Sequence, residues 1–231
     1  MPTNTAIVTG ATGFVGSHLV RSLLEQGHTV VASNVSGSRE RLEDVAHRVT
    51  FVRADVGSFS NVLQMVKEHK PAVIYHLGAM RGPQCDADPE AGIRANAIGT
   101  YNILEAARLF EVKQVIYASS LSVLSAANPS DPTVNDFSTT RPETIYATTK
   151  LFSENIGLCY RRLYGLDFRG LRLATVLGPG SDTPGYLEYF NKAIEQSIKG
   201  KPYAVYVAPR SRVPIIHVED AARAFVELAA N

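Results

Sequence analysis

Tyr146 and Lys150 have the residue types and the spacing of an acid–base pair. A separation of four places both side chains on one face of a predicted helix, near enough to interact. A phenol ionises near pH ~10, and a neighbouring ammonium favours the phenolate and lowers that pKa. Such a tyrosine could take a proton from a substrate hydroxyl while hydride leaves the same carbon. The same spacing is common on ordinary helix surfaces, and the pair alone favours that simpler interpretation.

A group of serines follows the predicted strand at 114–119. The carboxyl end of this strand is expected at the same rim of the sheet as a glycine turn near the N-terminus. The Ser120 hydroxyl could hydrogen-bond a substrate oxygen and orient it toward Tyr146. Serines at strand ends are otherwise ordinary turn and capping residues, and this explanation suffices for Ser122 and Ser125 on their own.

Three glycines spaced by three, Gly10, Gly13 and Gly16, separate a short apolar strand from an amphipathic helix. Glycine accepts the tight backbone angles of such a turn and lets phosphates approach without meeting a Cβ. The N–H groups at the start of the helix then face a pyrophosphate. A glycine turn alone is weak evidence for dinucleotide binding, so the rest of the chain must support it.

The elements that position these residues alternate between short apolar runs and amphipathic stretches. We predict strands at 6–9, 29–33, 49–53, 72–76, 114–119 and 167–173. We predict helices at 15–25, 59–69, 90–110 and 144–164. The alternation is typical of an α/β fold with a doubly wound parallel sheet and right-handed crossovers. Ligands of such sheets bind outside the carboxyl ends of the strands.

Two segments interrupt the alternation. Residues 126–142 are rich in Pro, Asn, Asp, Ser and Thr and are predicted to form a long surface loop. A second loop contains Gly178, Pro179 and Gly180. After it we predict helices at 186–199 and 219–230 and short strands at 204–207 and 213–217.

The bulk composition excludes several classes of protein. The 231 residues are 45% hydrophobic and 19% charged, which is ordinary for a globular protein. The net charge of +1 gives no reason to expect nucleic acid, and no segment is typical of a signal peptide or membrane span. Two cysteines and six scattered histidines indicate neither a disulfide framework nor a metal site. We expect a cytoplasmic protein whose partners include neither nucleic acid nor a membrane.

Together these motifs resemble the extended short-chain dehydrogenase/reductase family, also called the NAD-dependent epimerase/dehydratase family. The resemblance rests on the turn at 9–16, Thr-Gly-Ala-Thr-Gly-Phe-Val-Gly, and on Ser120 and Tyr146 with Lys150. It continues over nearly the whole chain, through Asp55-Val56, the segments at 76–79 and 96–100, Arg172, Gly178-Pro179, Arg212 and the segment at 217–220. It implies a Rossmann-like NAD(P)-binding domain at 1–175 and a small, partial substrate-binding lobe at 176–231.

The resemblance also implies roles for single residues. Ser120 would be the hydroxyl partner of the substrate oxygen, Tyr146 the acid/base, and Lys150 the residue that holds the nicotinamide ribose. The candidates for cofactor binding are Gly10, Gly13, Phe14, Val15, Gly16, Asn34, Arg39, Asp55, Val56, Leu77, Gly78, Ala79 and Asn96, with Tyr146 and Lys150. The candidates for substrate binding are Ser122, Thr175 and Arg212.

The end of the second predicted strand departs from the family pattern. Many members carry an acidic residue there that accepts hydrogen bonds from the adenosine ribose, whereas this chain has Asn34. An amide does not repel a 2′-phosphate, and the guanidinium of the nearby Arg39 suits phosphate. The cofactor is therefore NAD or NADP, with a slight preference for NADP. Arg39 and Arg41 on a solvated helix face are nearly as good an explanation.

The C-terminal part also departs from the sugar-nucleotide members. Residues 200–214 are more similar to the small-substrate branch, which includes L-threonine 3-dehydrogenase and hydroxy-acid dehydrogenases. We expect an oxidoreductase that transfers hydride at a secondary alcohol of a small hydroxy-acid, amino-acid or sugar-type substrate. A UDP-sugar epimerase or dehydratase is the alternative. A non-catalytic dinucleotide sensor is a further alternative, although Ser120, Tyr146 and Lys150 are all present.

Three further expectations concern partners, the chain end and Cys85. The predicted helices at 90–110 and 144–164 carry apolar residues on more than one face. The resemblance implies a homodimer in which these helices form a four-helix contact, although packing against the sheet explains most of the same residues.

Family members continue beyond the position of Asn231, so part of the substrate pocket is expected to be missing or supplied by a neighbouring subunit. Cys85 could face the active site, but a buried, idle thiol is the simpler expectation.

Overall fold

The structure, a computed structural model, describes residues 4–124, 134–181, 188–208, 210 and 212–231. Its core is a six-stranded parallel sheet with the strand order β3-β2-β1-β4-β5-β6. The strands are β1 (Thr5–Thr9), β2 (Thr29–Asn34), β3 (Val49–Arg53), β4 (Val73–His76), β5 (Gln114–Ser120) and β6 (Asp167–Leu173). This order is that of the Rossmann fold and confirms the predicted α/β class.

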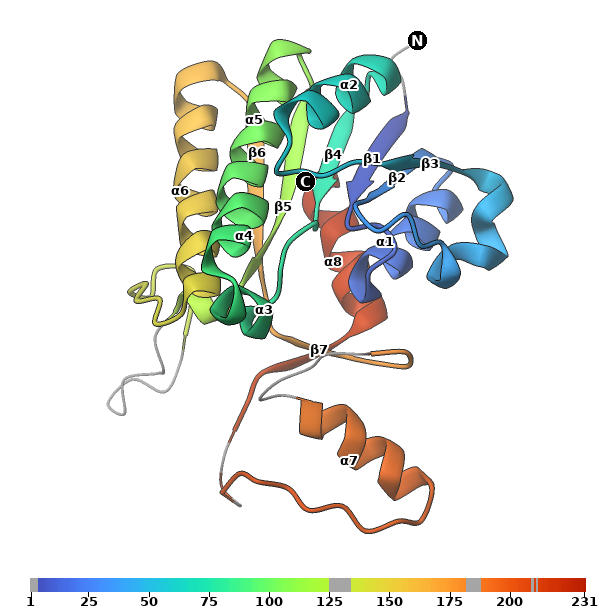
Figure 1. Cartoon of the computed structure of the whole chain (residues 1–231), viewed down its shortest axis with the longest axis vertical. Coiled ribbons are helices and arrows are strands. Elements are labelled where there is room, and N and C mark those ends of the chain that lie inside the picture. Colours follow the sequence, from blue (N-terminus) through green and yellow to red (C-terminus); the bar gives the residue numbers. More distant parts are fainter. Residues whose placement is uncertain (1–3, 125–133, 182–187, 209, 211) are drawn as a thin grey trace.

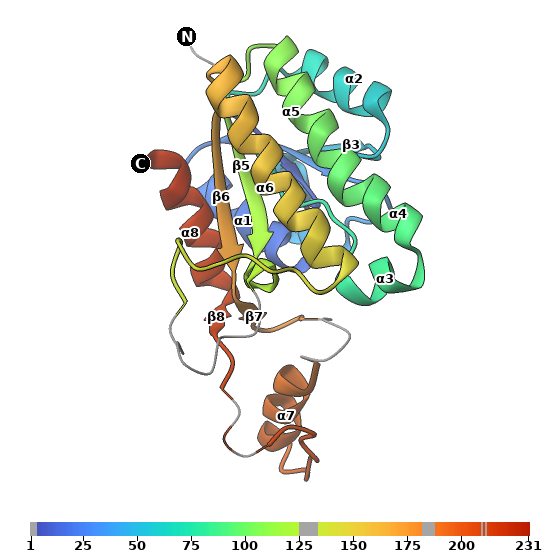
Figure 2. The same ribbon diagram turned by 90° about the vertical axis from the view of Figure 1, so that its left-hand side faces the viewer.

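Helices cover both faces of this sheet (Figures 1 and 2). One face carries α1 (Phe14–Glu25) and α8 (Val218–Ala230), and the other carries α2 (Phe59–His69), α5 (Gly99–Leu109) and α6 (Ile145–Tyr164). Alternate side chains of β1 enter the two cores, since Ala6 and Val8 pack with α1 while Ile7 packs with α2 and α5. Burial of both strand faces explains the apolar runs in the central strands β1, β4 and β5.

The position of α6 matters most for the site. Thr144 caps its start by accepting a hydrogen bond from the Ala147 N–H at 3.1 Å, and Gly165 ends it with φ +72°. Tyr146 therefore lies in the first turn. Gly157 lets the helix approach β6, because a Cβ at this position would lie 2.3 Å from the Phe168 ring.

The predicted helix at 90–110 is interrupted. The structure divides it into α4 (Pro89–Ile93), a π-helical turn (Arg94–Ile98) and α5. In the turn, the Asn96 carbonyl accepts hydrogen bonds from the hydroxyls of Thr100, at 2.6 Å, and Ser153, at 3.3 Å. These hydroxyls compete with the backbone for the carbonyl, which is one way a helix widens locally.

Other short elements were not predicted. They are helix α3 (Gly82–Ala87), the 3₁₀ turn η3 (Leu121–Val123) and strand β7 (Thr175–Leu177). The 3₁₀ stretch η1 (Glu40–Arg48) contains Arg41, which one of the two interpretations of the sequence placed on a solvated helix face. β7 pairs in parallel with β8 (Ile215–His217), which falls within the predicted strand at 213–217. The predicted strand at 204–207 is wrong, because these residues have no regular structure and leave Tyr206 86% exposed. Residues 126–133 of the predicted loop at 126–142 lie outside the described residues, whereas 134–142 are described.

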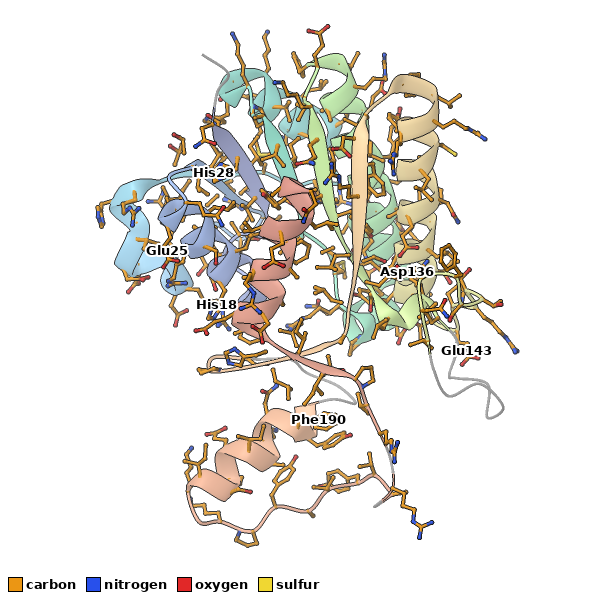
Figure 3. All side chains as sticks on the ribbon, turned by 180° about the vertical axis from the view of Figure 1, so that it is seen from behind. His18, Glu25, His28, Asp136, Glu143 and Phe190 are labelled. Atoms are coloured by element: carbon orange, nitrogen blue, oxygen red, sulfur yellow. The ribbon has the colours of Figure 1, made fainter. Side chains whose placement is uncertain are left out.

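The C-terminal residues divide between two places. Helix α7 (Glu188–Ile198) lies apart from the sheet, beyond the carboxyl ends of the strands (Figures 1 and 3). Helix α8 instead returns to the sheet, where its Phe225 is fully buried with Leu19 and Leu23 of α1. The predicted lobe at 176–231 thus includes a helix that belongs to the core of the sheet domain. None of the described helices is long and apolar enough to cross a membrane.

Candidate active site

The glycine turn after β1 is built for close backbone contacts. Gly10 has φ +67°, and a Cβ there would lie 2.9 Å from the Gly78 nitrogen. A Cβ on Gly16 would lie 2.2 Å from the Gly10 carbonyl oxygen. Gly78 is held in turn by Thr9, whose hydroxyl accepts a hydrogen bond from the Gly78 N–H at 3.0 Å. The loop after β1 and the loop after β4 therefore form one tight unit.

The N-terminus of α1 fits an anionic group. Gly13 caps the helix without a side-chain hydrogen bond, and the first turn carries no acidic residue. The helix dipole and the first-turn N–H groups thus favour a phosphate at this position. Phe14 lies nearby, within 3.4 Å of the place where a Cβ on Gly178 would be, while Val15 packs against the core. The turn accordingly has the shape and polarity to hold a pyrophosphate.

A small hollow lies at the end of β2, beside the glycine turn. It is lined by Thr12, Ala32, Asn34, Gly37, Ser38, Arg39, Phe51, Val52 and Arg53. The Asn34 amide donates to the Thr12 hydroxyl, and its oxygen accepts from the Val35 N–H at 2.7 Å. The Arg39 guanidinium lies 4.5 Å from the centre of the Phe51 ring. The hollow therefore combines an amide and guanidinium groups at the place predicted for the adenosine ribose.

Asp55 and Val56 lie at the next strand end. The Asp55 carboxylate accepts from the Gly57 N–H at 2.8 Å and lies 3.4 Å from the Arg94 guanidinium. Val56 packs against Gly99, where a Cβ would lie 2.8 Å from its Cγ2. These contacts fix the two residues predicted to line the adenine.

Asn96 is placed differently from the other cofactor candidates. Its side chain is 2% exposed and is used within the protein. The amide oxygen accepts from the Met80 N–H at 2.7 Å, and the amide nitrogen donates to the Met80 carbonyl at 3.1 Å and to the Thr149 hydroxyl at 3.1 Å. Asn96 therefore ties the loop that contains Leu77, Gly78 and the exposed Ala79 to helix α6.

Ser120, Tyr146 and Lys150 converge at the carboxyl end of β5. The Lys150 ammonium donates to the Ala118 carbonyl at 2.7 Å and lies 5.5 Å from the centre of the Tyr146 ring. The Ser120 hydroxyl interacts with the Tyr146 phenol, and it also accepts from the Ser122 hydroxyl at 2.9 Å. The three predicted residues thus form one cluster, with Ser122 beside it.

The protonation states differ from the expectation. We predicted that Lys150 lowers the pKa of Tyr146, but burial raises this pKa to about 12, and the interaction with Ser120 offsets only part of that rise. Burial also lowers the pKa of Lys150 to about 8. Desolvation is the largest cause of both shifts, because burial disfavours the charged form of each group. Tyr146 is therefore a neutral phenol at neutral pH.

The other substrate candidates lie toward α7. Thr175 is in β7, where its N–H donates to the Pro214 carbonyl at 3.2 Å. Arg212 lines an open groove together with Tyr189, Phe190 and Ala193 of α7 and with Val205, Val207, Ala208, Val213 and Ile215. Figure 3 shows Phe190 at the N-terminal end of α7. The aromatic residues of this groove were not predicted, although the apolar positions of the predicted helix at 186–199 could have indicated them.

Within the described ranges, no group of three or more His, Cys, Asp or Glu side chains is arranged to hold a metal ion. Cys85 is fully buried, and its sulfur lies 3.5 Å from the Asn96 amide nitrogen.

Comparison with known proteins identifies the family. Residues 6–231 match the model of the NAD dependent epimerase/dehydratase family, and the chain belongs to this family. It is similar to a UDP-glucose 4-epimerase of Mycolicibacterium smegmatis, with 33% identity over 225 residues, 95% of this chain and 71% of the epimerase. It is also similar to the mitochondrial L-threonine 3-dehydrogenase of Bos taurus, with 25% identity over 225 residues, 96% of this chain but only 59% of the dehydrogenase.

A solved structure supports the same assignment. The crystal structure of Thermus thermophilus UDP-glucose 4-epimerase in complex with NAD has a TM-score of 0.85 and 28% identity to this chain. The match covers 96% of this chain and 73% of the epimerase. The family resemblance inferred from the sequence is thereby confirmed, including its relatives in both the epimerase and the dehydrogenase branches.

Proposed function

We propose that this chain carries the dinucleotide site and the catalytic residues of an oxidoreductase acting at a secondary alcohol. The observation that carries the proposal is the convergence of the glycine turn and the Ser120–Tyr146–Lys150 cluster at the carboxyl edge of one parallel sheet. A bound nicotinamide cofactor would supply the hydride acceptor or donor. Gly13 and the first turn of α1 would hold its pyrophosphate, and Lys150 would hold its ribose.

The residues of the cluster have complementary tasks. Ser120 orients the substrate oxygen toward the phenol of Tyr146. Tyr146 is protonated in the free protein, so it is ready to donate its proton to a carbonyl oxygen during reduction. In the direction of oxidation, Tyr146 must first lose its own proton, and the resulting phenolate then takes the proton of the substrate hydroxyl. Lys150, fixed by the Ala118 carbonyl, favours the phenolate that this transfer leaves.

The proposal is tested with dinucleotides and a substrate panel. NAD⁺ or NADP⁺ is expected to raise the melting temperature through binding to the native state. Reduced-cofactor absorbance with L-threonine, hydroxy acids and UDP-sugars then reports dehydrogenation, and product analysis of the UDP-sugars reports epimerisation. Stabilisation without any reaction would support the sensor alternative, and no stabilisation by either dinucleotide would contradict the proposal.

The substrate class has two candidates. The segment at 200–214 favours a small hydroxy-acid or amino-acid substrate, whose carboxylate Arg212 would bind. A UDP-sugar is supported by the epimerase relatives and by the groove at α7, where Tyr189 and Phe190 could stack on a base and Arg212 could bind a phosphate. Epimerisation of a UDP-sugar without net growth of reduced cofactor would decide for the second candidate.

We further propose that the hollow at Asn34 accepts a 2′-phosphate, so that NADP binds at least as well as NAD. Replacing Asn34 by Asp is expected to shift the ratio of the two dissociation constants toward NAD by about tenfold, because a carboxylate repels phosphate and accepts from ribose hydroxyls. The ratio is measured by dinucleotide titration of both proteins. Arg39→Ala is the second variant, and it should weaken the binding of NADP⁺ while leaving the binding of NAD⁺ unchanged. An unchanged ratio in both variants would show that the hollow does not contact the 2′ position.

We also propose a homodimer formed by α5 and α6. The outer side of α6 exposes Phe152 by 44% and Leu163 by 62%, at positions that share one helix face, and Tyr101 of α5 is 39% exposed. Phe152→Glu is expected to convert a dimer to a monomer, as measured by size-exclusion chromatography with light scattering. Ile198→Glu, a matched change at an 82% exposed residue of α7, should leave the dimer intact. A monomeric unmodified protein would refute the proposed contact.

A further inference from the structure

A buried carboxylate lies one helical turn beyond Lys150. Glu154 is 8% exposed and Lys150 is 3% exposed. The Glu154 carboxylate accepts from the Ser119 hydroxyl at 2.5 Å and from two nitrogens of the Arg172 guanidinium, at 3.0 and 2.8 Å. Three donors from two neighbouring strands therefore hold the negative charge of Glu154 in a fixed place behind the active site.

The other titratable groups around Lys150 are neutral near pH 7. His76 of β4 has a pKa lowered to about 3 by burial and by Lys150 itself. Burial raises the pKa of Tyr117 of β5, whose ring centre lies 4.9 Å from the Lys150 nitrogen, and raises that of Tyr146 to about 12. Cys85 of α3 would attract the ammonium as a thiolate, but burial raises the thiol pKa, so Cys85 is uncharged at neutral pH.

Glu154 is therefore the neighbour that opposes the effect of burial on Lys150. Desolvation disfavours the ammonium, while the charge of Glu154 favours it. Glu154 is itself anchored by Arg172, which lies near the end of β6. Ser119, the third member of this group, directly precedes Ser120 in β5. Through this carboxylate, helix α6, which also carries Lys150, is linked to the strand that carries Ser120.

We propose that Glu154 is a positioning residue that keeps Lys150 charged and fixes the strand end carrying Ser120. The inference deepens the proposed function and rests on it for its catalytic meaning. The effect of the Glu154 charge on the protonation of Lys150 is present in the free protein, without a bound dinucleotide. A loss of the Glu154 charge removes the carboxylate that, among the described residues, favours the buried Lys150 ammonium, so the ammonium releases its proton at lower pH.

The test is a titration of the Lys150 side chain in the free protein. Lysine is labelled with ¹³C at Cε, and the Lys150 resonance is assigned by its absence from Lys150→Met. Lys150 of the unmodified protein is expected to titrate with a midpoint near pH 8. In Glu154→Gln the midpoint should lie about one pH unit lower, which corresponds to an acid dissociation constant about tenfold larger. Glu154→Asp should restore most of the difference, because it keeps the charge.

Two more variants separate the charge from the packing. Ser119→Ala removes one hydrogen bond but keeps the Glu154 charge, so the Lys150 midpoint should not move. Should Glu154→Gln fail to fold because Arg172 is left unpaired, the double variant Glu154→Gln with Arg172→Met removes both charges and should still show the lowered midpoint. A folded charge-removing variant with the midpoint of the unmodified protein would overturn the inference.

Activity provides an independent readout. Where turnover is detected, the alkaline limb of the pH profile should move to lower pH in Glu154→Gln and remain in place in Ser119→Ala. Absence of turnover in the unmodified protein would count against the proposed function, whereas the titration of Lys150 would still decide the role of Glu154.

Discussion

Tyr146→Phe is expected to lower turnover by about 10²- to 10⁴-fold while leaving dinucleotide binding intact. The change removes only the hydroxyl that exchanges a proton with the substrate, and general acid–base groups contribute about this much. The ring remains beside the Lys150 ammonium, so the local packing is kept. Steady-state rates with the substrate found in the panel measure the first effect, and dinucleotide titration measures the second.

The matched control is Tyr117→Phe. Tyr117 also places its ring next to the Lys150 ammonium, at 4.9 Å, but its side chain lies in the core on β5. Removing its hydroxyl should change turnover by only a few fold. Equal losses in both variants would mean that any disturbance near Lys150 reduces activity, and substantial activity in Tyr146→Phe would assign the proton transfer to another group.

Gly16→Ala is expected to abolish stabilisation by NAD⁺ and NADP⁺ and to lower the free energy of unfolding by about 1–3 kcal/mol. At an ordinary helix position the change would stabilise by up to ~1 kcal/mol. Here the new Cβ would lie 2.2 Å from the Gly10 carbonyl oxygen and 3.0 Å from the Ala11 Cα. These are backbone atoms, so helix α1 must move away from the turn, and the first-turn N–H groups lose their position.

Gly82→Ala provides the comparison for this effect. Gly82 begins α3, and a Cβ there meets nothing within 4 Å. We expect this variant to keep both its stability and its response to dinucleotides. Urea unfolding gives the change in free energy, and thermal shift with each dinucleotide gives the response. A Gly16→Ala protein that still binds either dinucleotide with unchanged affinity would contradict the role of the turn.

The strands and the main helices were predictable because local patterns determine them. β3 (Val49–Arg53) and β6 (Asp167–Leu173) have the predicted bounds. Helix α2 also has its predicted bounds, and α6 differs by one residue at its start. The parallel, doubly wound arrangement was predicted from the alternation of strands and helices, whereas the order of the strands in the sheet was not predicted.

The missed features depend on contacts between distant residues. The π-helical turn widens where hydroxyls of Thr100 and Ser153 reach the Asn96 carbonyl, and Ser153 lies on another helix. The partners of Asn96 and Glu154 come likewise from separate segments. The raised pKa of Tyr146 was missed because its main cause is burial, which spacing alone does not reveal. The spacing of Glu154 from Lys150 was visible in the sequence, but its partner Arg172 is brought there by the parallel sheet.

Helix α8 returns to the core between α1 and the sheet, and this has a consequence for how the chain folds. Phe225 and Ala222 complete the packing of Leu19 and Val20, about two hundred positions earlier in the sequence. Contacts between residues so far apart form late, because closing so large a loop costs entropy before any contact stabilises it. During synthesis, only α1 of the two helices on this side covers the sheet until residues 218–230 have left the ribosome. The apolar surface of α1 is then the part of the nascent chain most in need of protection from aggregation.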